Sequence, residues 1–288
     1  MLHVIAMVIL AQAGVRQVTR VSQDEPVYSP DGKRILWVSD VDGPGNIHVM
    51  DADGRHAVRL TNDAMSEDGP IWSADGERIA FAAMDKAKGV SEIWLMNADG
   101  SGRRQLTHDG AFAIHPAWSP DGKRLLYTTT RESRNKAYDK ADNWQTFIID
   151  ADGKNARRLP ADGPVNTYAS FSPDGKRIVL RKKPSDQSKI SDVVVMDADG
   201  THAQFLTHGG AYDRFPVFSP DGKRIVFESN RSGHSQLLLM NADGSDVRVL
   251  VDGGGQMSAP RFAPDGKQVI FPRADANKEL RIFTVDVP

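Results

Sequence analysis

Short apolar runs separated by polar turns recur along the whole chain. Runs of four or five residues, such as RILWV (34–38) and IWLM (93–96), are rich in β-branched and aromatic side chains. Glycine, proline, aspartate and asparagine cluster between these runs. Apolar runs of this length between turn residues predict β-strands joined as hairpins.

One turn sequence marks six copies of a common unit. SPDGKR or a close variant begins at Ser29, Ser73, Ser119, Ser172, Ser219 and Ala263, with spacings of 44, 46, 53, 47 and 44 residues. An aromatic residue precedes every copy, and a β-rich run follows it. Repeats of this length are typical of propellers and solenoids.

The turn residues predict how the strands of each unit connect. Proline presets φ, aspartate bonds local backbone N–H groups, and glycine accepts the left-handed conformation. A second turn, DADG or NADG, begins at Asp51, Asn97, Asp150, Asp197 and Asn241. Each unit is therefore predicted to be four antiparallel strands with both tight turns at the same end.

The sixth unit lacks its fourth strand, since LRIFTVD (280–286) is followed by no second turn. A segment resembling the fourth strands, RQVT (16–19), stands alone before the first unit. We expect this N-terminal strand to complete the last blade, which closes a ring and disfavours a linear solenoid. The predicted fold is an all-β, six-bladed β-propeller of four-stranded antiparallel blades, forming a single domain over residues 14–288.

These units resemble the WD40-like repeats of the TolB propeller family. The resemblance rests on the aromatic-SPDGKR, DADG and RxLT segments and covers about Val15 to Val287. It implies a propeller that binds partner proteins in the cell envelope. The TolB protein of that family also carries a separate N-terminal α/β domain, for which we expect no room before Val15.

Composition narrows the classes of partner. A net charge of −2 gives no general attraction to nucleic acid. The absence of cysteine excludes disulfides, thiolate nucleophiles and cysteine zinc sites. Residues 1–13 form an apolar run ending in AQA, which predicts a signal peptide or an N-terminal extension and is too short to span a bilayer. We expect a periplasmic or secreted monomer without membrane insertion, the alternative being a cytoplasmic protein.

The loops that vary in length lie opposite the tight turns, and ligand sites favour variable loops on a rigid scaffold. Residues just before each first strand are expected to surround the mouth of the central channel: Asp24, Glu25, Glu67, Asp68, His115, Asn166, Tyr168, Asp213 and Arg214. This predicted ring is mostly acidic. It suits a basic group or a divalent cation, with Glu25, Glu67, His115 and Asp213 as candidate ligands. The simpler interpretation is that these side chains only solvate the channel mouth, and no cofactor is predicted.

The third unit contains the longest variable loop, residues 130–145. It combines Arg131, Arg134, Tyr138 and Trp144, residue types that dominate binding hot spots. We expect this loop to be the main recognition element, the alternative being a solvated loop without a partner.

The sequence contains no GxSxG, HExxH, Walker or GxGxxG motif, so no catalytic residue is predicted. The favoured hypothesis is a non-enzymatic propeller that binds a protein or peptide through its variable loops. The alternative is a metal-assisted hydrolase or lyase that acts on a sugar or lactone at the channel mouth.

Overall fold

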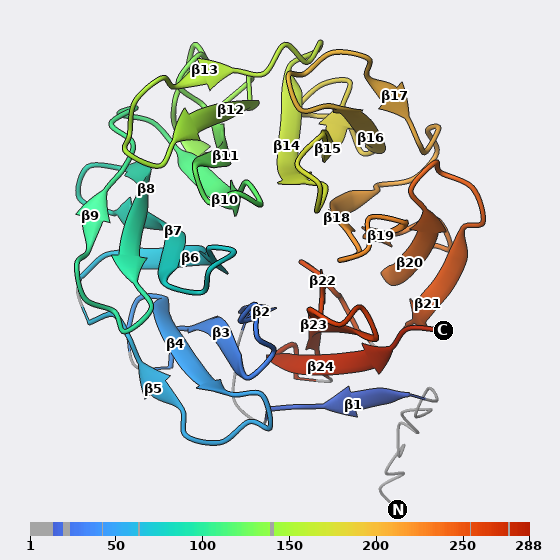
Figure 1. The fold of residues 1–288 in the computed structure, drawn as a ribbon. Helices are drawn as coiled ribbons and strands as arrows, with labels where there is room; N and C mark the ends of the chain where they lie inside the picture. The colour runs from blue at the N-terminus through green and yellow to red at the C-terminus, as the bar shows by residue number, and fades with distance from the viewer. Residues whose placement is uncertain are drawn as a thin grey trace, which may run out of the picture.

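The computed structural model describes residues 14–19, 24–41, 43–62, 64–138, 141–253, 255–275 and 277–288. Their strands form six four-stranded antiparallel sheets, which are arranged in a ring as the blades of a propeller (Figure 1). This confirms the fold predicted from the repeats. The predicted signal peptide or extension, residues 1–13, lies outside the described residues.

Each blade is built from strands that follow one another outward from the channel. Blade 1 comprises β2 (Asp24–Tyr28), β3 (Arg34–Ser39), β4 (Asn46–Asp51) and β5 (Val58–Arg59). Blade 2 comprises β6 (Ser66–Trp72), β7 (Arg78–Asp85), β8 (Val90–Asn97) and β9 (Arg104–Gln105). Blade 3 comprises β10 (Ala113–Trp118), β11 (Arg124–Thr129), β12 (Gln145–Asp150) and β13 (Arg157–Arg158).

The second half of the ring repeats this arrangement. Blade 4 comprises β14 (Val165–Phe171), β15 (Arg177–Lys183), β16 (Asp192–Asp197) and β17 (Gln204–Phe205). Blade 5 comprises β18 (Arg214–Phe218), β19 (Arg224–Ser229), β20 (Gln236–Asn241) and β21 (Arg248–Asp252). Blade 6 comprises β22 (Arg261–Phe262), β23 (Gln268–Ala274), β24 (Leu280–Asp286) and β1 (Val15–Gln17).

The ring closes where the two ends of the chain share blade 6. β1 pairs antiparallel with β24, so that Val15 lies opposite Val285 and Gln17 opposite Phe283. The backbone N–H of Val18 extends the pairing by donating to the carbonyl of Ile282 at 2.8 Å. The predicted closure by the N-terminal strand is therefore confirmed.

The SPDG turns have the geometry that their residues predict. In blade 1, Ser29 Oγ donates to Asp31 Oδ1 at 2.6 Å and accepts the N–H of Arg34 at 2.9 Å. Gly32 follows with a φ of 71°, in the left-handed region that glycine enters without steric penalty. The same turn in the other blades places all these hairpin ends on one face of the ring, the turn-bearing face.

Neighbouring blades are joined through the aromatic residues that precede the turns. The guanidinium of Arg34 in blade 1 lies 4.6 Å from the ring of Trp72 in blade 2, and Arg78 lies equally close to Trp118 in blade 3. Apolar side chains of adjacent blades fill the space below these pairs. The hydrophobic core is thus divided into separate clusters between neighbouring blades. The axis of the ring is not part of this core, and the channel lies there.

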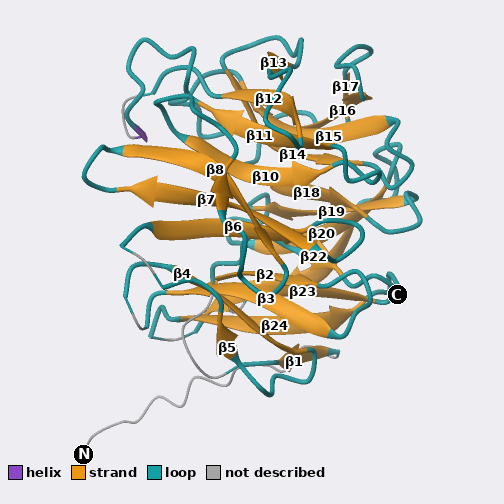
Figure 2. Ribbon diagram, turned by 60° about the vertical axis from the view of Figure 1, so that its left-hand side comes forward, coloured by secondary structure: helices purple, strands orange, loops and turns teal. Residues whose placement is uncertain are grey.

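The opposite face, here called the loop-bearing face, carries the connections from second to third strands and from each blade to the next. Figure 2 shows loops emerging at both ends of the strands. In the part of the chain that the structure describes, no helix is long and apolar enough to cross a membrane.

Candidate functional site

Each blade has one residue in the left-handed conformation, within its innermost strand in blades 1 to 5 and just before it in blade 6. These residues, with φ between 36° and 57°, are Glu25, Gly69, His115, Tyr168, Phe215 and Ala259. In blades 1 to 5 the strand register shifts at this point, which identifies a β-bulge. Proline follows the residue in every blade except blade 4, as edge strands and bulges permit. Because the feature recurs in all six blades, it belongs to the scaffold.

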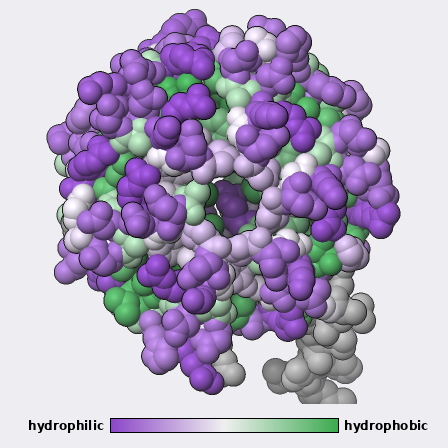
Figure 3. All heavy atoms as spheres, in the orientation of Figure 1, coloured by the Kyte–Doolittle hydropathy of each residue, from purple (hydrophilic) through white to green (hydrophobic). Residues whose placement is uncertain are grey.

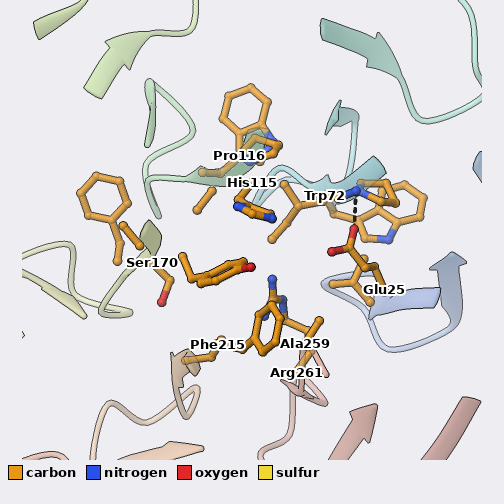
Figure 4. A pocket seen from close by; sticks show the side chains of 18 of the residues that line it. Glu25, Trp72, His115, Pro116, Ser170, Phe215, Ala259 and Arg261 are labelled. Atoms are coloured by element: carbon orange, nitrogen blue, oxygen red, sulfur yellow. Dashed lines mark hydrogen bonds between the residues drawn. The ribbon is translucent and has the colours of Figure 1, made fainter. Parts of the chain in front are cut away.

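These six residues line the channel together and are here called the bulge ring, to which Gly69 contributes only backbone. The rings of His115, Tyr168 and Phe215 contact one another with centroid distances of 4.2 and 4.3 Å. Figure 4 shows Glu25, His115 and Arg261 directed into the same space. A cavity of about 240 Å³ extends from the bulge ring toward the turn-bearing face. Seen along the axis, the channel opens at the centre of the ring of blades (Figure 3).

Three polar groups of the channel lie within ligand distance of one another. Single ligand atoms of Glu25, Asp68 and His115 are all within 4.8 Å of each other. Glu25 Oε2 also accepts a short hydrogen bond from the backbone N–H of Gly69. Two carboxylates and an imidazole form a donor set suited to a divalent cation such as Mn²⁺ or Zn²⁺.

Burial changes the protonation of this group. The pKa of Glu25 is raised well above its ordinary value by burial, and further by the charges of Asp68 and Asp24. Burial also raises the pKa of Asp24 to about 6, an effect that the backbone hydrogen bond from Glu25 opposes. The pKa of His115 is lowered to about 3 by burial and by the nearby charges of Arg181 and Arg261. His115 is therefore neutral at physiological pH, and its buried Nδ1 has no hydrogen-bond partner among the described residues.

Two cavities open from the bulge ring on the loop-bearing side. The first, of about 550 Å³, is lined by four acidic residues, Asp24, Asp40, Glu67 and Asp68, of which Glu67 has a buried side chain, and is here called the acidic cavity. The second, of about 360 Å³, is lined by the cations Arg181, Lys183 and Arg214 and by one acidic residue, Asp186, and is here called the basic cavity. The mouth is thus acidic beside blades 1 and 2 and basic beside blades 4 and 5. The ring predicted from the sequence is mostly acidic, because Arg181 and Lys183 lie on a second strand, outside the segments that begin the first strands.

Three of the residues predicted at the channel mouth lie within the blades. Glu67 accepts bonds from Arg103 at 2.9 Å and Thr61 at 3.1 Å, and its side chain is buried. Asp213 pairs with Arg231 at 3.1 Å, and the fully buried Asn166 donates to Gln145. Each of these three residues stands two positions before a residue of the bulge ring. In a regular strand, side chains two positions apart point to the same side. The β-bulge interrupts this alternation, so the three side chains point into the blades and not into the channel.

The remaining predicted residues lie around the channel. Asp24, Asp68 and Arg214 line the loop-bearing cavities, and Glu25, His115 and Tyr168 belong to the bulge ring. Of the four predicted metal ligands, the structure brings Glu25 and His115 together. Asp68 completes their group, and Glu67 and Asp213 do not belong to it.

The long loop of blade 3 is only partly available for binding. Trp144 is 7% exposed and packs in a core cluster with Ile114 and Val165, so its prediction as a surface contact is wrong. Arg131 pairs with Asp109 at 2.9 Å. Tyr138 is 59% exposed.

The loop thus presents Tyr138 on a rigid support, since its ring packs edge-on against Phe112 and Trp144 with centroids 5.4 and 5.3 Å apart. Arg134 pairs with Asp142 and is largely exposed. Tyr138 lines both the acidic and the basic cavity.

Four residues of the site are not predicted from the sequence: Arg181, Lys183, Tyr212 and Arg261. The only signal was the charge pattern of blade 4, where RIVLRKK (177–183) places three cations at the end of a second strand that is otherwise apolar. Arg261 lies one residue before the aromatic of blade 6, and burial lowers its pKa while the charge of Glu25 raises it.

Comparison with known families supports the repeat assignment. The model of the tricorn protease N-terminal β-propeller domain matches residues 44–190, about half of the chain. The model of the TolB β-propeller domain matches residues 183–288. No curated protein matches the chain.

Solved structures of low sequence identity share the fold. A protein assigned as TolB from Agrobacterium tumefaciens is 22% identical with a TM-score of 0.71, over 95% of this chain and 97% of that one. TolB from Acinetobacter baumannii is 19% identical with a TM-score of 0.65, over 95% of this chain and 64% of that one. An oligogalacturonate lyase in complex with manganese is 13% identical with a TM-score of 0.63, over 97% and 94%.

Proposed function

Because the chain belongs to the family of tricorn- and TolB-type β-propellers, we propose that it is a non-enzymatic binding protein that holds a protein or peptide partner at its loop-bearing face. The partner occupies the acidic and basic cavities, which together form one recognition surface. The apolar run in residues 1–13 and the TolB-like repeats support a location in the periplasm or outside the cell.

One observation carries the proposal: two cavities of opposite charge meet at an exposed aromatic side chain. The acidic and basic cavities share Ile114, His115 and Tyr138. A peptide that bears a basic and an acidic side chain matches such a surface over a short length of extended chain. Complementary charges set the orientation and register of a bound partner more than its affinity.

Tyr138 supplies the central contact. Its ring is supported by Phe112 and Trp144, so that little side-chain freedom is lost when a partner packs against it. Large aromatic side chains with this support are typical of binding hot spots. Tyr138→Ala is therefore expected to weaken partner binding by about 1 to 3 kcal/mol.

A displayed library of random peptides, selected on the immobilised protein, tests this function. We expect enriched peptides to lose affinity for the Tyr138→Ala variant and to keep it for Lys223→Ala, which changes a turn on the opposite face. Failure to enrich any peptide, or equal binding to both variants and the parent, contradicts the proposal.

A second candidate function is favoured by the group of Glu25, Asp68 and His115. These residues would hold a divalent cation, which supplies Lewis-acid chemistry to a hydrolase or lyase acting on a sugar or lactone. His115 is suited to the role because its ring is neutral and one nitrogen has no partner in the described structure. Titration with Mn²⁺ followed by calorimetry distinguishes the two functions: stoichiometric binding that Asp68→Asn abolishes favours the enzyme, and absence of binding removes it.

A further inference from the structure

Two buried cations in blade 4 have no charged partner. Arg181 and Lys183 lie on the same side of β15 and are 7% and 6% exposed. Arg181 donates from Nε to Thr167 Oγ1 and from Nη1 to the hydroxyl of Tyr212, each at 2.8 Å. Lys183 Nζ donates to the backbone carbonyl of Asp186 at 2.6 Å. All three acceptors are neutral. Asp186 also lines the cavity, but neither cation forms an ion pair with its carboxylate or with any other described carboxylate.

Three arginines near this face form ion pairs. Arg103 pairs with Glu67 at 2.9 Å, Arg231 with Asp213 at 3.1 Å and Arg214 with Glu228 at 2.5 Å. Isolated buried charges are strongly disfavoured, and buried cations are normally paired with an anion. Arg181 and Lys183 differ from these three arginines because neither has an anionic partner.

Both unpaired cations line the basic cavity, which is open to the loop-bearing face. The guanidinium of Arg181 lies 4.6 Å from the ring of Tyr168 and 5.5 Å from that of Tyr212. These two rings fix the position of the guanidinium group. Its remaining N–H groups, which do not donate to Thr167 or Tyr212, are available to a ligand. A carboxylate suits this arrangement because arginine can bond both of its oxygens while lysine adds a point charge.

We propose that the basic cavity is a binding site for a carboxylate carried by a peptide, either an acidic side chain or a C-terminus. The carboxylate of the ligand supplies the negative charge with which Arg181 and Lys183 would pair. This inference rests on the proposed peptide-binding function, and it assigns one end of the bound segment to blade 4. The acidic cavity then receives the basic end of the same segment.

Calorimetry with a tetraglutamate peptide at low ionic strength tests the site. The parent protein is expected to bind tetraglutamate and not the neutral tetraglutamine. Lys183→Met should lower the affinity for tetraglutamate by roughly ten- to a hundredfold, as expected for one charge-assisted hydrogen bond. The melting temperature of this variant should equal or exceed that of the parent, because the substitution removes an unpaired buried charge.

Lys182→Met is the matched control. Lys182 is the preceding residue of β15, but its ammonium lies over Phe205 and does not line the basic cavity. Its substitution removes the same charge and should leave the affinity within about twofold. Equal loss in both variants, binding of tetraglutamine, or no binding of tetraglutamate overturns the site.

The source of the carboxylate is tested separately with digalacturonate. Binding tighter than that of tetraglutamate, and lost in Lys183→Met, overturns the peptide assignment in favour of an acidic sugar. The two proposals also fail differently. If selected peptides bind through Tyr138 but are insensitive to Lys183→Met, the proposed function stands and the carboxylate site falls. If tetraglutamate binds through Lys183 but no peptide depends on Tyr138, the carboxylate site stands and the recognition surface falls.

Discussion

Asp24 is held beside two other carboxylates in a largely buried part of the acidic cavity. Burial is the main reason why its pKa rises from 3.8 to about 6, and the charge of Asp68 adds to the effect. An acid whose pKa is higher in the folded than in the unfolded protein stabilises the fold at low pH. This contribution is complete below about pH 4 and is lost as the pH rises through about 6.

Asp24→Asn should remove this dependence on pH. Asparagine keeps an oxygen for the N–H of Glu25, which now donates to Asp24 Oδ1 at 2.8 Å. The difference in unfolding free energy between variant and parent should grow from near zero at pH 4 to about 3 kcal/mol in favour of the variant above pH 7. Urea unfolding over this pH range measures it.

Asp31→Asn is a control of opposite sign. Its exposed carboxylate has a lowered pKa, because Ser29 Oγ and the N–H of Lys33 donate to it. The stability that Asp31 contributes is therefore present at neutral pH and lost in acid. A pH profile for Asp24→Asn that runs parallel to the parent's would show that the Asp24 pKa is not raised.

At the scale of the element, the SPDG hairpin turn fixes the geometry of each blade. Gly222 in blade 5 has a φ of 69°, and a Cβ built there would meet Pro173 of the neighbouring blade at an ordinary 3.5 Å. Gly222→Val should therefore destabilise through backbone strain alone, by about 1 to 2 kcal/mol. Lys223→Ala in the same turn should have little effect on the melting temperature, and equal effects would contradict the turn assignment.

The blade 3 loop contains one buried aromatic residue, Trp144, and one exposed aromatic residue, Tyr138. Trp144→Ala should lower the unfolding free energy by about 3 to 5 kcal/mol, because it empties a site in the core cluster. Tyr138→Ala should leave the melting temperature within a few degrees of the parent's. Thermal denaturation of the two variants side by side measures this contrast. A stable Trp144→Ala variant would mean that the loop does not pack as described.

These elements indicate what the sequence predicts and what it leaves out. The turns and strands are predictable because SPDG and DADG encode their local conformation directly. The bulge ring is not, since six different residues occupy its positions, although the proline that follows most of them was a usable signal. The burial of Trp144 is also not predictable, because nothing in the local sequence of a long polar loop indicates that its tryptophan is buried. Its burial depends on Val165 in the next blade, to which it is bridged.

At the scale of the whole molecule, three residues of β1 hold the ring closed. Deleting residues 15–19 removes the outer strand of blade 6 and exposes the edge of β24, which then has unpaired N–H and carbonyl groups. The deletion variant should melt at a lower temperature, over a broader range, and should aggregate. Scanning calorimetry and light scattering measure these effects.

Arg16→Ala provides the control for this deletion. It removes the exposed ion pair with Asp286 at 2.7 Å and leaves the strand in place. An exposed pair contributes about 0 to 1 kcal/mol, so the melting temperature should hardly change. If the deletion variant instead melts like the parent, β1 does not fasten the ring.

The sharing of blade 6 by the two chain ends also determines when the ring can close during synthesis. Arg16 and its partner Asp286 are 270 residues apart in the chain, and β1 leaves the ribosome long before β24 exists. At about 5 to 20 residues per second, β1 waits roughly 15 to 50 seconds for its partner. Blades 1 to 5 are synthesised one after another during that interval, and at its end blade 6 still lacks β24. Until then the nascent propeller is an open arc, and the blades at its two ends expose surfaces that the closed ring buries. A chaperone that prevents aggregation would bind at these two ends.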